Sequence, residues 1–271
     1  MTSDVTDAND TTVTNPQAVP TVPAGATDTT RCEQAVSVIR ENLRDRIAAT
    51  RYVLFGFDGP LCRLFDQSAA RTASEGMRTF LEERGVAALA PGADLGGLSD
   101  PVDILRTVGE LHPASDLVAD LEEWLARQEQ RAVPGAWPAM YADGVVRTWS
   151  ATGGRLAVTT DHSSRAVRDY LTGRGLTECF GPHIHGRTAA DLQLLKPHPH
   201  TLEQALAGLG ADRTATLVIG DSVRDLRAAQ EIGLPFLAYA TDDLAVDELA
   251  SAGADLVLNT WEPVLDILWG R

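Results

Sequence analysis

The hydrophobic pattern of the chain changes near residue 134. Before this point apolar residues mostly recur at helical spacing, and one buried strand is expected in YVLFGFDG (52–59), which runs into a loop. After it, short apolar runs alternate with amphipathic stretches. The helices predicted by the spacing are 36–47, 68–84, 101–111, 115–130, 163–173, 199–209, 223–232, 243–252 and 261–269. The later strands are predicted at 155–160, 216–221, 235–240 and 254–258, and a short strand is considered at 183–185.

Strands that alternate with helices indicate a parallel sheet covered on both faces. Ligands of such sheets bind at the carboxyl ends of the strands. Polar residues stand at these places, namely Asp58, Thr159, Thr160 and Asp221. We therefore expect the functional side chains to gather at one edge of the sheet.

Residues 1–30 differ from the rest of the chain. They are rich in Thr, Asp, Pro and Ala and contain no Lys, Arg or aromatic residue. Such a segment buries too little apolar surface to offset the entropy of ordering it, and it lacks the basic start and apolar stretch of a secretory signal. It is predicted to be a disordered tail.

Composition narrows the function classes. The 271 residues are 44% hydrophobic, enough for one core and a smaller second unit. A net charge of −15 repels nucleic-acid phosphates and anionic membranes, and no apolar run approaches the length of a membrane span. Three cysteines without a CxxC pair indicate a reducing compartment, so a cytoplasmic location is expected. The oligomeric state does not follow from the sequence.

The most specific motif is VIGDSVRDLRAAQEIG (218–233). Asp221 follows a strand, and Asp225 stands four residues later in the first turn of a helix. Two carboxylates at such a loop suit Mg²⁺, which prefers oxygen ligands. The alternative is that Ser222 or Asp221 only caps the helix.

Three further positions carry candidate chemistry. In FGFDGPL (55–61), Asp58 is followed by Gly59, which lets the backbone turn close to a ligand. Thr159 offers a hydroxyl to an anionic oxygen, with Thr160 and the start of a helix near Ser163 beside it. Lys196, pinned before a proline in LLKPHPH, can hold a phosphate as a point charge.

Taken in order, FGFDGPL, LAVTTDHS, LLKPHP and VIGDSVRDLRAAQEIGLP make the chain resemble the haloacid dehalogenase-like hydrolase superfamily, in its phosphoglycolate phosphatase and β-phosphoglucomutase-like branch. The resemblance covers roughly residues 51–259. It implies a Rossmann-like, doubly wound parallel-sheet core in two pieces, 31–66 and 133–271. A mobile helical cap, residues 67–132, would be inserted between them.

The resemblance also implies roles for residues. Asp58 matches the general acid/base, whose backbone carbonyl contacts Mg²⁺. Thr159 and Lys196 match the pair that holds the phosphate. Asp221 matches the Mg²⁺ ligand, and Asp225 matches its supporting carboxylate.

One departure affects the chemistry directly. The family's nucleophile is an Asp two residues before the acid/base, and this position is Gly56. Glycine can form no aspartyl-phosphate, and the same missing carboxylate is a Mg²⁺ ligand. Pro60 also replaces the Thr of most relatives and removes a backbone donor. Cys62 and Asp66 are considered as substitutes but lie past the loop, and a water activated by Asp58 is a further alternative.

Histidines and arginines offer weaker signals. Two HxH pairs invite a metal interpretation, although they lie on different predicted elements, and His162 follows the Thr159 strand closely enough to reach a substrate. A histidine without a role in a loop is the alternative. In the cap, the candidates for substrate contacts are Arg71, Arg78 and Arg106.

Two functions remain open at this stage. The first is a Mg²⁺-dependent phosphatase acting on a small phosphorylated metabolite, with altered or weak catalysis. The second is a non-catalytic member of the same fold that binds a phosphorylated ligand or a protein partner. The retained Asp58, Lys196 and Asp221 favour a site still in use, and Gly56 favours loss of hydrolysis.

Overall fold

The computed structural model describes residues 28–85 and 95–271. The chain divides into two compact units, residues 1–41 and Asn42–Arg271, and the fold described below is that of the second unit. Helix α1 (Asp28–Ala49) begins within the expected tail, and the remaining tail residues, 1–27, lie outside the described residues. No described helix is long and apolar enough to span a bilayer.

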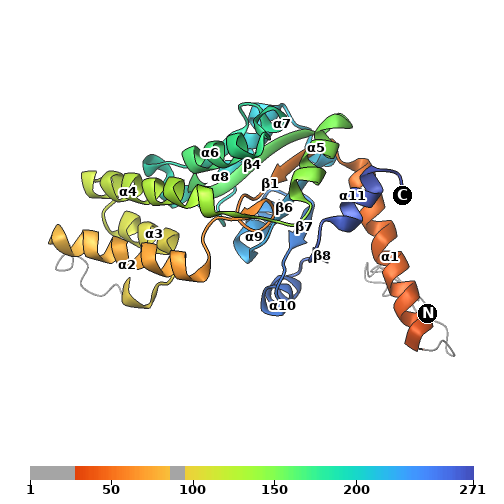
Figure 1. Ribbon diagram of the computed structural model, residues 1–271, viewed down its shortest axis with the longest axis horizontal. Helices are drawn as coiled ribbons and strands as arrows, with labels where there is room; N and C mark the ends of the chain where they lie inside the picture. The colour runs from red at the N-terminus through yellow and green to blue at the C-terminus, as the bar shows by residue number, and fades with distance from the viewer. Residues whose placement is uncertain (1–27, 86–94) are drawn as a thin grey trace, which may run out of the picture. The chain divides into compact units, whose positions relative to one another are not determined.

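A six-stranded sheet forms the centre of the second unit (Figure 1). All its neighbouring strands pair in parallel, in the order β5-β4-β1-β6-β7-β8. The strands are β1 (Tyr52–Phe55), β4 (Arg155–Ser163), β5 (Ile184–Arg187), β6 (Thr216–Gly220), β7 (Phe236–Tyr239) and β8 (Val257–Leu258). The predicted parallel α/β sheet is confirmed, and the chain leaves β1 toward both edges, as in a doubly wound fold.

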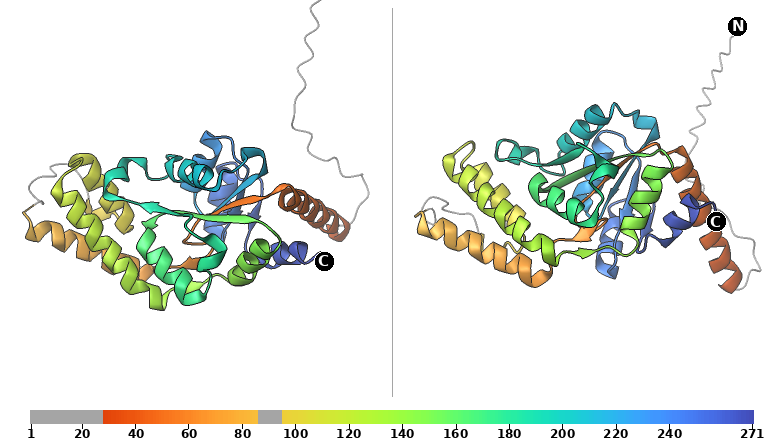
Figure 2. Two further views of the ribbon diagram at one scale, coloured as in Figure 1. Left: turned by 90° about the horizontal axis from the view of Figure 1, so that it is seen from above. Right: turned by 45° about the horizontal axis from the view of Figure 1, so that its top comes forward.

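Helices cover both faces of the sheet because alternate strand residues point to opposite sides (Figure 2). In β1, Val53 and Phe55 belong to one core cluster, and Tyr52 and Leu54 belong to the other. The first face packs against α1, α5 (Ala142–Ala151), α6 (Ser164–Arg174), α7 (Thr177–Phe180) and α11 (Glu262–Leu268). The second face packs against α8 (His200–Leu209), α9 (Val223–Glu231) and α10 (Asp243–Ser251).

The cap is helical, as predicted. Its helices are α2 (Gln67–Glu83), α3 (Pro101–Leu111) and α4 (Asp116–Ala132), with a short 3₁₀ turn, η2 (Leu95–Gly97). They share a core of their own, to which Leu192 and Leu195 contribute from the segment around η4 (Ala189–Leu194) of the sheet domain. Two short antiparallel strands, β2 (Cys62–Arg63) and β3 (Trp137–Pro138), lie where the chain leaves the sheet domain and returns to it.

Some elements differ from the predictions. Helix α5 was not expected, because its N-cap residue, Tyr141, is in a left-handed conformation and makes no side-chain cap hydrogen bond, so the sequence carries no start signal. Strand β4 continues to Ser163 instead of ending at 160, with a shift of register between Thr159 and Ser163. Strand β8 is confined to Val257–Leu258. Packing against neighbours, absent from the local pattern, decides each of these boundaries.

Candidate active site

A cavity of about 620 Å³ lies at the carboxyl ends of β1, β4 and β6. Its sheet-side wall carries most of the residues singled out in the sequence: Gly56, Asp58, Thr160, Lys196, Asp221 and Asp225. The cap contributes Ala70 and residues 99–102. The expectation that one sheet edge collects these side chains therefore agrees with their positions in the fold.

At the start of α9, the Asp225 carboxylate is held by hydrogen bonds to the protein, whereas Asp221 faces the cavity. Ser222 is the N-cap: its hydroxyl accepts from the Asp225 backbone N–H (3.2 Å), and Asp225 Oδ2 accepts from the Ser222 N–H (3.2 Å) and hydroxyl (2.6 Å). This is a capping box. Asp225 is thus held in place, while Asp221 precedes the helix and lines the cavity. The capping alternative applies to Ser222, and Asp221 remains available to a ligand.

Lys196 is anchored inside the site. Its Nζ donates to the Thr159 carbonyl (2.9 Å) and to Asp225 Oδ1, and its backbone N–H donates to Asp161 Oδ1 (3.2 Å). Burial disfavours its charged form, but Asp225 and Asp161 outweigh burial and raise the pKa of Lys196. The ammonium group is therefore a fixed positive charge on the cavity wall.

The two neighbouring threonines play different structural parts. Thr160 lines the cavity, and its hydroxyl accepts from the His162 N–H (3.1 Å). Thr159 is buried, its hydroxyl has no hydrogen-bond partner among the described residues, and it is absent from the cavity lining. Thr160, Asp161 and His162 line the cavity in succession, because the register of β4 shifts between Thr159 and Ser163. The threonine hydroxyl in the cavity lining is that of Thr160, and a role for Thr159 stays a prediction.

The loop after β1 brings two carboxylates close together. Asp58 Oδ1 accepts from the Leu64 N–H (2.8 Å). Gly59 has φ = +81°, and a Cβ there would lie 2.4 Å from Asp221 Cγ, so only glycine permits this approach. Burial, then the neighbouring Asp225 and Asp58 carboxylates, raise the pKa of Asp221 well above its ordinary value. Negative charge is concentrated at this end of the cavity.

Gly56 occupies the cavity wall two residues before Asp58. Its backbone N–H donates to the Ile219 carbonyl (2.7 Å), which continues the pairing with β6. It is not among the glycines with positive φ. The position of the family's nucleophile is therefore an ordinary backbone site that has no side chain to offer.

The donor set for a metal is small. Among residues 28–85 and 95–271, no group of three or more His, Cys, Asp or Glu side chains is placed to hold an ion. Asp225 uses both oxygens on protein partners, so Asp221 is the carboxylate left free by these contacts. The two HxH pairs form no such group either.

A buried ionic network that the sequence analysis missed lies next to Asp58. Glu129 of cap helix α4 is fully buried; its carboxylate pairs with Arg187 (2.7 and 3.1 Å), accepts from the Ser163 N–H (2.8 Å) and meets His162 Nδ1 (2.9 Å). On its other side, His162 Nε2 lies 3.7 Å from Asp58 Oδ2. The cap is thus joined to the candidate acid/base through one imidazole ring.

This network fixes the charge of the imidazole. Burial opposes protonation of His162, but its contacts with Asp58 and Glu129 prevail and raise its pKa to about 10. Burial likewise opposes ionisation of Glu129, but Arg187 and His162 prevail and lower its pKa to about 2. The sequence does hold a sign of this network: Glu129 follows Leu121 and Leu125 at four-residue spacing and therefore lies on the apolar face of α4.

The remaining candidates take structural positions. Cys62 is buried, and burial followed by the charge of Asp58 raises the pKa of its thiol, so a nucleophilic thiolate is disfavoured. Asp66 caps α2 by accepting from the Ala69 N–H (2.7 Å). Arg78 donates to the carbonyls of residues 95 and 98. Arg106 pairs with Asp161 (3.4 Å), whereas Arg71 is exposed.

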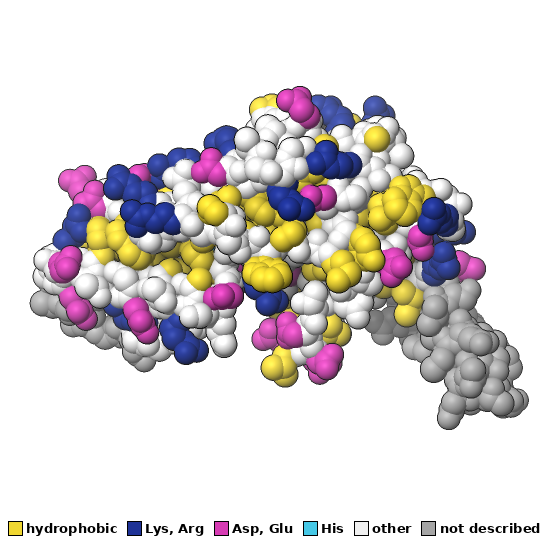
Figure 3. Space-filling model, in the orientation of Figure 1, with side chains coloured by type: hydrophobic (Ala, Val, Ile, Leu, Met, Phe, Trp, Pro, Cys, Tyr) yellow, Lys and Arg dark blue, Asp and Glu magenta, His cyan; other side chains and the backbone are white. Residues whose placement is uncertain are grey.

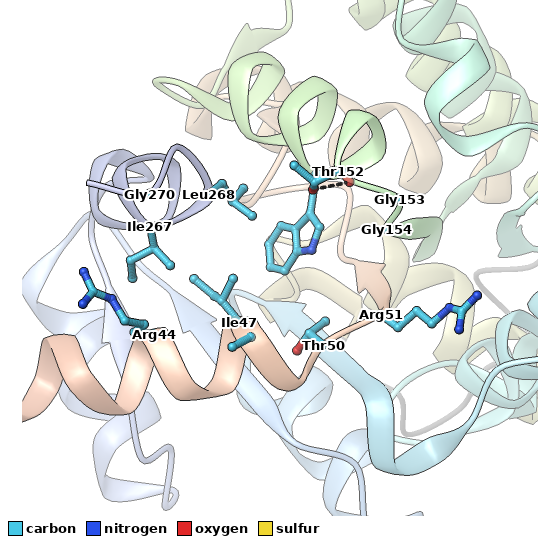
Figure 4. A pocket seen from close by; sticks show the side chains of 12 residues that line it. Arg44, Ile47, Thr50, Arg51, Thr152, Gly153, Gly154, Ile267, Leu268 and Gly270 are labelled. Carbon is cyan, nitrogen blue, oxygen red and sulfur yellow. Dashed lines mark hydrogen bonds between the residues drawn. The ribbon is translucent and has the colours of Figure 1, made fainter.

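Another cavity, of about 750 Å³, lies at the opposite end of the strands (Figure 4). Its wall is formed by the end of α1, the residues that precede β1 and β4, and the carboxyl-terminal segment. Arg44, Arg51 and Trp149 are among its lining residues, and none of the described residues that line it is a carboxylate, histidine or cysteine. These described residues therefore offer no acid/base or metal-binding side chain.

Comparisons with known proteins agree with this geometry. The family model described as haloacid dehalogenase-like hydrolase matches residues 109–239. The chain is 26% identical over 152 residues to the probable phosphatase IndB of Dickeya dadantii, covering 55% of this chain and 64% of that relative. It is 27% identical over 221 residues to phosphoglycolate phosphatase of Rhodospirillum rubrum, covering 80% of this chain and 90% of that relative.

The fold has solved counterparts as well. A crystal structure described as a predicted phosphatase from Clostridium acetobutylicum superposes with a TM-score of 0.60 at 17% identity. The superposition covers 82% of this chain and 99% of that one. At this identity the match concerns the architecture, including the helical cap region.

Proposed function

We propose that the chain binds a small phosphorylated metabolite and hydrolyses it weakly with Mg²⁺. The premise is that the chain belongs to the haloacid dehalogenase-like hydrolase superfamily, in its phosphoglycolate phosphatase-like branch. The observation that carries the proposal is the shared cavity of Asp58, Thr160, Lys196 and Asp221. These groups supply an acid/base, a hydroxyl, a fixed cation and a metal ligand at one place.

Lys196 and Thr160 would hold the phosphoryl oxygens. The ammonium group is held by Asp225 and the Thr159 carbonyl, so little side-chain entropy remains to be lost when an anion binds. The Thr160 hydroxyl can rotate its hydrogen toward a phosphate oxygen. Asp58 would take the proton of an attacking water, the leaving oxygen would take its proton from solvent, and the Asp58 carboxylate is oriented by the Leu64 N–H.

The residues present fit Mg²⁺ as a weakly held ion. Oxygen donors are what this cation prefers, and it is often bound by one or two carboxylates together with waters and substrate phosphate. Asp221 and the Asp58 backbone carbonyl would hold it, and Asp225 would support them through its fixed position. When bound, the ion would offset phosphate charge. Burial, and then the nearby Asp225 and Asp58 carboxylates, raise the pKa of Asp221, and a bound cation would offset this negative charge.

Gly56 limits the reaction. No carboxylate is present to attack phosphorus, so the aspartyl-phosphate of the family cannot form at this position. The route left to this chain is attack by water with Asp58 as the base. Gly56 also favours a second function, binding of a phosphorylated ligand without turnover.

Other features of the proposal rest on composition. The acidic chain suits a small metabolite better than a nucleic acid or an anionic membrane as its partner. Cys62 and Cys179 are free, which supports a cytoplasmic location.

The two functions are separated by one pair of measurements on the purified protein. Phosphate release is followed over a panel of phosphorylated metabolites with and without Mg²⁺, and binding of inorganic phosphate is followed by calorimetry. Slow, Mg²⁺-dependent release is expected from the proposed enzyme. Binding without release would replace it with the ligand-binding function, and the absence of both would refute the phosphate site.

A further inference from the structure

A second cavity, of about 700 Å³, reaches Asp58 and Asp221 from another direction. It lies at the carboxyl ends of β7 and β8, between the residues that follow these strands and the pair β2 and β3, here called the linker sheet (Cys62–Arg63 and Trp137–Pro138). We call it the linker cavity. Since it shares Asp58 and Asp221 with the candidate active site, a group bound in it would adjoin the proposed phosphate position.

Two large apolar side chains on one wall of the linker cavity are exposed to solvent, so they contribute little to the hydrophobic core. The Trp137 side chain is 75% exposed and Met140 is 68% exposed, and both line the cavity. An exposed indole forgoes the large area that a tryptophan can bury, so clustered exposed apolar residues indicate a binding surface. In Figure 3, hydrophobic side chains reach the surface between the cap and α10.

The backbone beneath this wall is fixed. The Ala139 N–H donates to the Leu61 carbonyl (3.0 Å), and Trp261 Nε1 donates to the Pro60 carbonyl (2.8 Å). Trp137 pairs with Arg63 across the linker sheet. Trp137 is therefore presented from an anchored backbone, which lowers the entropic cost of stacking a ligand against it.

The charges around the linker cavity decide what can enter. Asp66 and Asp242 stand at its rim, and Asp58 and Asp221 stand at its inner end. Arg63 is the single cation among the described residues that line it. Neutral donors and acceptors come from Thr241 and Asn259. A second anionic group on the ligand would be repelled, whereas an uncharged flat ring could stack on Trp137 and hydrogen bond to the neutral groups.

We propose that the linker cavity binds the organic part of the phosphate ester, and that this part carries an uncharged flat ring. The inference rests on the proposed function, because it places the ring relative to a phosphate held by Lys196 and Thr160. It narrows the substrate class to phosphate esters of uncharged ring compounds, and it makes Trp137 a specificity-determining residue.

The test uses phosphonates, whose P–C bond is not hydrolysed, so that binding is read without turnover. Calorimetry in the presence of Mg²⁺ compares methylphosphonate, phenylphosphonate and phosphonoacetate on the full chain. Phenylphosphonate should bind about three- to tenfold more tightly than methylphosphonate, the range of one aromatic contact. Phosphonoacetate, with its added carboxylate, should bind more weakly than methylphosphonate.

Variants localise the effect. W137A should remove the advantage of phenylphosphonate and leave methylphosphonate unchanged, and W137F should keep most of it. W269A is the matched control, because Trp269 is also exposed (52%) but is absent from both cavities. Equal binding of the two phosphonates, or a phenyl advantage that survives W137A, overturns the inference while the phosphate site stands. No binding of any phosphonate or of inorganic phosphate refutes the proposed function itself.

Discussion

Replacing Gly56 by aspartate restores the one group that the site lacks for the chemistry of its family. A Cβ at this position would have the Ile219 carbonyl oxygen at 3.3 Å and Pro60 Cγ at 3.5 Å as near neighbours. The first contact is tight by a few tenths of an ångström, and φ is outside the left-handed region that disfavours side chains. Gly56→Asp should therefore fold with a small local shift.

The expected gain in rate is large because catalytic groups act as a unit. Loss of one member of such a set costs on the order of 10⁴–10⁶ in rate. At about 1.4 kcal/mol per factor of ten, this is about 5.5–8 kcal/mol of barrier. Asp58, Thr160, Lys196 and Asp221 already line the same cavity, so Gly56→Asp should create or strongly raise Mg²⁺-dependent phosphatase activity.

The assay compares Gly56→Asp with Gly56→Asn, which has similar bulk but no nucleophile. Both variants should fold, and Gly56→Asn should stay at the parent level of phosphate release. Without metal, the carboxylate added near Asp58 and Asp221 should lower the free energy of unfolding by on the order of 1 kcal/mol, and Mg²⁺ should restore that free energy. If Gly56→Asp folds, binds Mg²⁺ and releases no more phosphate than Gly56→Asn, restoration of the nucleophile is refuted and binding without turnover is favoured.

Two further variants test the surroundings of the site. Mg²⁺ at millimolar concentration should raise the melting temperature of the parent by mass action, and Asp221→Asn should abolish this rise. Without metal, Asp221→Asn should be as stable as the parent or more stable, because it removes a carboxyl group with a raised pKa. Absence of any Mg²⁺ effect in the parent would count against the metal site. Glu129→Gln should lower the free energy of unfolding by up to about 3–5 kcal/mol, since it removes the buried carboxylate that Arg187 and His162 share and leaves them only Glu122 (3.3 Å) and Asp58 (3.7 Å). The matched change Glu123→Gln, on the same helix but at a solvent-exposed ion pair, should change the urea denaturation midpoint little, and equal effects of the two variants would refute the network. The pKa of Glu129 is lower in the folded protein than in the unfolded chain. The contribution of its ionised carboxylate to the free energy of unfolding is therefore fully present above about pH 4.5 and is lost as the pH falls toward about 2. The difference in the free energy of unfolding between the parent and Glu129→Gln should shrink over that pH range.

Much of the architecture is determined by local pattern. Alternation of apolar runs with amphipathic stretches predicts the parallel sheet, because each strand must be buried on both faces and each helix on one. Chain order then places Asp58, Thr160 and Asp221 near strand ends, and strands running in parallel bring those ends to one edge. The glycine at position 56 is likewise readable from the sequence, and the resemblance to the family is what identifies this position with that of the nucleophile.

Contacts between distant segments were decided only by the tertiary structure. Glu129 and Arg187 are 58 positions apart, on a cap helix and on a strand, and no local pattern links an acid in one element with a base in another. Which residues at the end of β4 line the cavity also depended on packing, because Thr160, Asp161 and His162 do so in a stretch where the register of β4 shifts. The exposed Trp137 acquired its position beside Asp58 through the linker sheet. Local sequence sets which way a side chain points along its own element, whereas its neighbours across the fold are set by how the elements pack.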